Sequence, residues 1–277
     1  MNFLFNLLIK TMLPLFPKMF VKIIAKDYVA GTTNDEVIRA IKKVNLNGSS
    51  ATIDILGEHT KDENKAIRIK NEYSKLYKII NQKNLDCNIS IKLSHIGYDI
   101  SKKLVFLNLK EIADSANTFN NFLRIDMENS SMTSDTLNIF NKIHKTNKNT
   151  GVVLQAYLHR TLKDVKNLPL KNINIRLCKG IYKENESIAF QNSQKINNNF
   201  IEILDLLLSG GAFVGIATHD EYLLEKIYKL IKDKNIPITQ FEFQTLYGVP
   251  MAKWNKRHKK NNYKTRVYIP FGDDWYS

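Results

Sequence analysis

Residues 172–184, with the sequence NINIRLCKGIYKE, are the stretch from which the expected fold follows. Apolar residues occupy alternate positions from 173 to 177, which is the period of a β-strand. Arg176 and Lys179 lie at and just beyond the end of this strand, and Gly180 lets the backbone turn or approach a ligand closely. Two cations where a strand gives way to a loop indicate either a solvated strand end or a site for an anionic or electron-rich ligand.

The same alternation recurs along the chain. It predicts further strands at 51–56, 87–93, 122–127, 151–156, 212–217, 238–243 and 265–269. Helical patterns separate them, most clearly at 61–82, 134–145, 186–208 and 221–234, while 102–109 fits an inserted turn or a short helix. Eight strands alternating with helices predict an α/β protein, a single (β/α)8 TIM barrel. A doubly wound open sheet is the alternative, but no strand is followed by G-x-G-x-x-G or a phosphate-binding P-loop.

The N-terminal part is expected to be helical. Residues 28–48 show one apolar helix face, and we expect residues 1–50 to pack as a helical segment on a barrel formed by residues 51–277. The apolar start is interrupted by Lys10, Pro14 and Pro17, so it is too short to span a bilayer, and it lacks the features of a signal peptide. We expect a helix within residues 3–24 that docks on the barrel; a membrane-surface anchor is the alternative.

Composition excludes several classes of function. The 277 residues carry a net charge of +14, but the lysines are scattered and accompany no RNA-recognition, helix-turn-helix or zinc-finger signature, so dedicated nucleic-acid binding is not expected. Cys87 and Cys178 are expected to be small buried residues in a reducing compartment. The six dispersed histidines lack the spacing of a metal site.

Polar or aromatic residues follow nearly every predicted strand. In a (β/α)8 barrel the carboxyl ends of the strands form the active site, so these residues are expected to form one ring: Glu58, Lys92, Asp126, Glu128, Gln155, Arg176, Lys179, Thr218, His219, Glu242, Gln244 and Tyr268. Lys179, Thr218 and His219 could hold phosphates by charge and by hydrogen-bond donation. No nucleophile–base pair or carboxylate cluster with metal spacing is present, which favours chemistry supplied by a cofactor.

Nine motifs, in order along nearly the whole chain, resemble those of bacterial monofunctional proline dehydrogenase: DYVAG (27–31), LGE (56–58), IKLSHIG (91–97), RIDMENS (124–130), LQAYL (154–158), RLCKGIY (176–182), ATHD (217–220), FEFQTLYG (241–248) and RVYIPFG (266–272). The resemblance implies a distorted barrel that binds FAD. It implies oxidation of L-proline to Δ1-pyrroline-5-carboxylate in proline catabolism, with hydride passing from proline C5 to the flavin. Electrons would then pass to a quinone or another acceptor.

The resemblance also implies a role for individual residues. Asp126 and Arg176 match catalytic positions, with Arg176 near the reactive nitrogen of the flavin. Substrate-binding positions match Lys92, Tyr182, Leu246 and Tyr268, and Asp126 is expected to pair with Lys92. Flavin-binding positions match Met127, Gln155, Arg176, Lys179, Gly180, Ile181, Thr218 and His219.

One feature departs from the resemblance. The family has a final helix with an Arg-Arg pair and a Glu that grip the substrate carboxylate, and the sequence ends at Ser277 before such a helix. We therefore expect the outer face of the last strand, with Val267 and Ile269, to be uncovered, and activity to be weak. The alternative to an active enzyme is a truncated remnant that binds flavin weakly or not at all. A cytoplasmic location is expected, with peripheral contact at the inner membrane face as an alternative.

Overall fold

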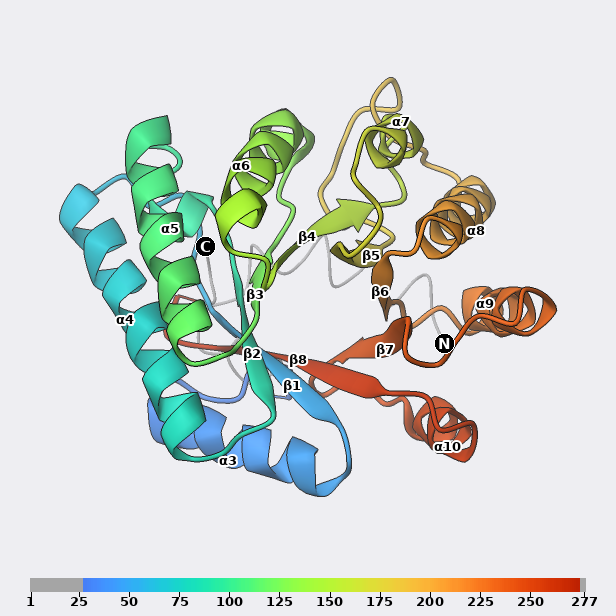
Figure 1. The fold of residues 1–277 in the computed structure, drawn as a ribbon, viewed down its shortest axis with the longest axis horizontal. Helices are drawn as coiled ribbons and strands as arrows, with labels where there is room; N and C mark the ends of the chain where they lie inside the picture. Colours follow the sequence, from blue (N-terminus) through green and yellow to red (C-terminus); the bar gives the residue numbers. More distant parts are fainter. Residues whose placement is uncertain (1–26, 275–277) are drawn as a thin grey trace, which may run out of the picture.

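Eight parallel strands close into a barrel in the computed structural model, which describes residues 27–274 (Figure 1). Each strand pairs with the next one, and the last pairs with the first, in the order Ser50–Ile55 (β1), Cys87–Ile91 (β2), Leu123–Ile125 (β3), Thr150–Gln155 (β4), Asn174–Cys178 (β5), Phe213–Ala217 (β6), Phe241–Leu246 (β7) and Thr265–Phe271 (β8). The predicted (β/α)8 barrel is confirmed.

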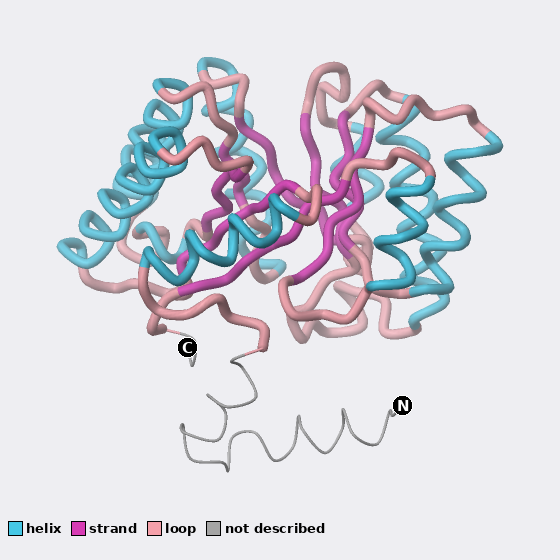
Figure 2. Tube along the Cα trace, turned by 90° about the horizontal axis from the view of Figure 1, so that it is seen from below, coloured by secondary structure: helices cyan, strands magenta, loops and turns pink. Residues whose placement is uncertain are grey.

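Helices surround the strands on the outside (Figures 1 and 2). They are Asn34–Leu46 (α3), Glu63–Gln82 (α4), Lys102–Thr118 (α5), Thr133–Thr146 (α6), Thr161–Lys166 (α7), Ser193–Ser209 (α8), Glu221–Asp233 (α9) and Ala252–Lys260 (α10), with short 3-10 turns at Ser94–Ile96 (η2) and Ser130–Met132 (η3). Apolar strand residues such as Ile53, Ile175 and Phe243 are buried in the hydrophobic core, whereas the residues between them are polar and bond across the barrel interior. This division produces the alternation seen in the sequence.

Several predicted boundaries were wrong. Residues 102–109 are neither a turn nor a short helix but the start of the 17-residue α5, whose Ser101 side chain caps the first turn. The strand predicted from 238 begins at Phe241, because Gln240 N–H bonds Pro237 in a turn. Helix α8 begins at Ser193 and α3 at Asn34, later than expected, where side-chain caps start them.

The amino end of α6 has no side-chain cap, because Met132 occupies the capping position and makes no side-chain bond. Asp135, in the first turn, accepts hydrogen bonds from Tyr98 and Lys102 of the neighbouring segment. The short α7 and the almost entirely polar α10 were not predicted.

The outer face of β8 is covered, which corrects the expectation that it would be bare. Helix α3 packs on β1 and β8 and crosses in front of the strands in Figure 2. Ile269 is fully buried, and Val267 is partly buried against the core. The helix expected within residues 3–24 lies outside the described residues. Within residues 27–274, no helix is long and apolar enough to cross a membrane.

Replacing Ile269 with alanine should therefore destabilise the protein. Deleting a buried isoleucine side chain leaves a cavity and costs about 2–5 kcal/mol of stability. The control is Leu46→Ala on α3, the helix that covers β8. Because the Leu46 side chain is 88% exposed, this change should alter stability by less than about 0.5 kcal/mol. Urea unfolding of the two variants and the parent measures this difference. Equal, small effects would mean that α3 does not cover β8.

Candidate active site

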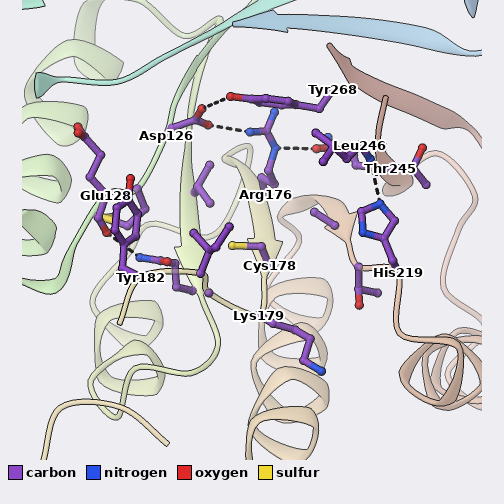
Figure 3. A pocket seen from close by; sticks show the side chains of 18 of the residues that line it. Asp126, Glu128, Arg176, Cys178, Lys179, Tyr182, His219, Thr245, Leu246 and Tyr268 are labelled. Carbon is purple, nitrogen blue, oxygen red and sulfur yellow. Dashed lines mark hydrogen bonds and ion pairs between the residues drawn. The ribbon is translucent and has the colours of Figure 1, made fainter. Parts of the chain in front are cut away.

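A cavity of about 590 Å³ opens at the carboxyl ends of the strands (Figure 3). Every residue to which the resemblance assigned a role lines it: Lys92, Asp126, Met127, Gln155, Arg176, Lys179, Gly180, Ile181, Tyr182, Thr218, His219, Leu246 and Tyr268. The structure thus brings together residues from five strands, β4 to β8, and from the segments that follow β2, β3, β5 and β6. Their roles remain predictions at this stage.

The floor of the cavity is an ion pair between Asp126 and Arg176. Arg176 Nη1 lies 2.7 Å from Asp126 Oδ1, and Arg176 Nε donates to Gln244 Oε1 at 2.6 Å. Asp126 also accepts from Ser90 Oγ at 2.6 Å and from the Tyr268 hydroxyl at 2.9 Å. The guanidinium is therefore fixed in orientation, with its charge next to the cavity (Figure 3).

Lys92 pairs with Asp54, not with Asp126 as expected. Lys92 Nζ lies 2.6 Å from Asp54 Oδ2, because Asp126 is already engaged by Arg176 and Tyr268. Burial disfavours the ammonium, but the charges of Asp54 and Asp126 outweigh it and raise the pKa of Lys92 above its usual range. Asp54 lies within β1 and not at its end, so the search of strand ends missed it. The sequence signal was a carboxylate inside the apolar run of a strand.

Aromatic and aliphatic side chains form the walls. Tyr182, Leu246 and Tyr268 line the cavity, and Ile181 is 89% exposed at its rim. Burial, with the carboxylates of Glu58 and Glu128, raises the pKa of Tyr182, so its hydroxyl stays protonated. These walls therefore offer neutral hydroxyl and apolar groups, next to the carboxylates of Asp126 and Glu128 that also line the cavity.

Donors at the ends of β5 and β6 point to a second subsite. Lys179 Nζ lies 2.8 Å from Asp220 Oδ2, and Asp220 caps α9 through its other oxygen. His219 Nε2 accepts the backbone N–H of Leu246 at 2.9 Å, and burial lowers the pKa of His219. The neutral ring therefore carries its proton on Nδ1, where it can donate to a ligand.

A glycine is required at the end of β5. Gly180 has a φ of +112°, and a Cβ there would lie 2.2 Å from the Tyr157 ring. Any other residue would displace the loop that carries Ile181 and Tyr182.

Within residues 27–274, no group of three His, Cys, Asp or Glu side chains could hold a metal ion.

The fold and this cavity define a (β/α)8-barrel enzyme whose site lies at the carboxyl ends of its strands. The sequence matches the family described as proline dehydrogenase over residues 37–274. Proline dehydrogenase 1 from Bacillus subtilis subsp. natto is 36% identical over 253 residues, which are 91% of this chain and 83% of that protein. Proline dehydrogenase from Deinococcus radiodurans is 29% identical and covers 92% of this chain and 83% of its own length.

A solved structure agrees with these sequence relatives. The crystal structure of proline utilization A from Bdellovibrio bacteriovorus, inactivated by N-propargylglycine, superposes with a TM-score of 0.83 at 27% identity. It covers 92% of this chain, which spans about a third (32%) of that longer protein. The chain belongs to the proline dehydrogenase family and is an enzyme of proline oxidation.

Removing the Asp126 carboxylate should destabilise the barrel strongly. Asp126→Ala leaves the Arg176 guanidinium buried without its partner, which costs about 3–5 kcal/mol. Asp135→Ala is a matched control, because it breaks the exposed pair with Lys102 and should cost under about 1 kcal/mol. Urea unfolding measures both. A loss at Asp126 no larger than at Asp135 would contradict the structural importance of the buried pair.

Proposed function

We propose that the cavity binds FAD and L-proline together, and that a hydride passes from proline C5 to the flavin to give Δ1-pyrroline-5-carboxylate. The observation that carries this proposal is the fixed Arg176 charge at the floor of a cavity with aromatic walls. Membership of the family supports it. We extend the proposal to a quinone or a similar electron acceptor for the second half of the reaction.

The residues present fit a flavin nucleotide. The cavity volume lies in the usual range for small-molecule sites. Lys179, the Thr218 hydroxyl and His219 Nδ1 offer the charge and the hydrogen-bond donors that phosphates need. Gly180 exposes backbone at the end of β5, and Gln155 is held by its bond from Nε2 to Glu128 O at 2.9 Å, so its Oε1 can accept from a heterocycle. Met127 and Ile181 would add apolar contact.

Bound FAD would supply the hydride acceptor. Arg176 would hold a positive charge beside the ring as electron density increases there, in an orientation that Asp126 and Gln244 fix in advance. Because Arg176 is only 7% exposed, its charge is weakly screened by water. Asp126 would act by holding Arg176 and the Tyr268 hydroxyl in place.

The substrate would lie between Lys92 and the walls. Lys92 donates one N–H to Asp54 and has two more for the proline carboxylate. Tyr182, Leu246 and Tyr268 would enclose the apolar part of the pyrrolidine ring and exclude water from it. The Arg176 guanidinium lies over the Tyr268 ring at 5.0 Å, which keeps this wall in one orientation.

Arg176→Ala and Lys179→Ala should both lose flavin during purification. A charged hydrogen bond is worth about 1.5–3 kcal/mol, so each change should weaken FAD binding about tenfold or more. With excess FAD, Lys179→Ala should recover L-proline oxidation in a dye-coupled assay, whereas Arg176→Ala should not, because it lacks the charge at the reacting end. Flavin absorbance of the purified proteins gives the first measurement.

The matched control is Lys42→Ala, at an exposed lysine of α3 far from the cavity. It should keep the flavin content and turnover of the parent. Flavin content equal to that of the parent in both Arg176→Ala and Lys179→Ala would contradict the assignment of this cavity to FAD.

A further inference from the structure

A carboxylate outside the assigned site poses a physical problem. Asp54 on β1 is 1% exposed, and among the described residues its Oδ1 has no hydrogen-bond partner. Its Oδ2 accepts from Lys92 Nζ at 2.6 Å. A buried carboxylate with an unsatisfied oxygen is costly, so its presence needs a reason.

Pairing of β1 with β2 does not supply that reason. Backbone pairing already sets the register of the two strands, with Ala51 opposite Cys87 and Ile53 opposite Ile89. Thr52 and Asn88 add a side-chain bond between the same strands, deeper in the barrel. Replacing a buried ion pair by apolar side chains is often neutral or stabilising, so stability alone does not account for Asp54.

Asp54 is the carboxylate that forms an ion pair with Lys92. Asp126 is the other carboxylate that raises the pKa of Lys92, but its oxygens accept from Ser90, Arg176 and Tyr268. The Lys92 side chain is 18% exposed and lines the cavity. The ammonium therefore has one N–H fixed by Asp54 and two that are available to an anion in the cavity.

We propose that Asp54 is the positioning residue that holds the Lys92 ammonium in one place at the cavity floor, ready to bind the carboxylate of the substrate. Asp54 does not line the cavity, so it acts through Lys92 and not by contact with substrate or flavin. This inference rests on the proposed function, since it takes the anion to be the carboxylate of L-proline.

Other titratable groups also lie near Lys92, and they determine how far its pKa would change if Asp54 were removed. Besides Asp54, the titratable groups within range of its charge are Asp126 and Glu128 directly after β3, Tyr182 in the loop after β5 and His95 of η2. Burial opposes the ammonium, while Asp54 and Asp126 raise the pKa of Lys92. Removing the Asp54 carboxylate should lower this pKa but leave Lys92 charged near neutrality.

The first experiment uses Asp54→Asn, which keeps the shape and removes the charge. In the flavin-loaded protein, KM for L-proline should rise about tenfold or more, while kcat and flavin content stay close to those of the parent. In the pH–activity profile, the fall in activity at high pH should begin at a lower pH than in the parent, because Lys92 loses its proton at a lower pH. Asp135→Asn, at the exposed pair with Lys102, is the matched control and should leave KM unchanged.

A double-mutant cycle tests whether Asp54 acts through Lys92. In a Lys92→Met background, Asp54→Asn should raise KM no further, because the group that it positions is absent. Asp54→Glu keeps the charge but moves it by one methylene, and it should also raise KM if position matters. An unchanged KM in Asp54→Asn, or a full additional rise in the Lys92→Met background, would overturn the proposal.

A measurement without flavin or proline separates this inference from the proposed function. The rate at which acetic anhydride acylates Lys92 at about pH 9, measured by mass spectrometry, reports the fraction of neutral amine. Asp54→Asn, or Asp54→Glu if the first variant does not fold, should alter this rate relative to the parent: faster in Asn, and changed less in Glu. An Asp54→Asn rate equal to that of the parent would refute the role of Asp54 even if L-proline is not the substrate. Failure of the parent to oxidise L-proline would instead count against the proposed function.

Discussion

The ion pair between Asp126 and Arg176 connects the strands through the middle of the barrel. Arg176 on β5 bonds Asp126, directly after β3, and Gln244 on β7, and Asp126 bonds Tyr268 on β8. TIM barrels commonly fill this space with branched apolar side chains. Here burial of charge is tolerated because each group meets a partner. A strand shifted by one residue would turn these groups outward, so the network fixes the register as well as the site.

Further buried charges lie below the cavity and do not line it. Gln244 donates to Glu242, which accepts from Arg266 at 2.7 Å on the adjacent β8. Arg124 on β3 is satisfied by the carbonyl oxygens of Val152 and Asn174, at 3.0 and 2.8 Å. Two layers of charge are thus stacked along the barrel axis. Only the upper layer borders the cavity; the lower one supports it by joining β7 to β8 and β3 to β4 and β5.

The sequence predicted the barrel and most of the residues that line the cavity, but not the contacts among them. Glu58 and Glu242 were expected in the same ring and do not line the cavity. Strand periodicity identifies inward positions, and topology brings strand ends together, so Lys92, Arg176 and His219 were placed correctly without knowledge of their partners. Pairing depends on side-chain direction across strands, which periodicity does not contain; hence Asp54 was missed as the partner of Lys92. Helix α10 was missed because it buries little besides Trp254 and His258, which leaves no apolar stripe to detect.

The seam between β1 and β8 shows that residues before the barrel also shape the site. Helix α3 covers the outer face of this seam, and the segment before it bonds the end of β8, from Ala30 N to Pro270 O at 2.9 Å and from Gly272 N to Gly31 O at 2.9 Å. On the inner face of the same strand, Tyr268 bonds Asp126. The β8 strand is therefore held from both sides. Tyr268 forms part of the cavity wall, so the position of this wall depends on α3 and on the segment before it, which lie outside the eight βα units.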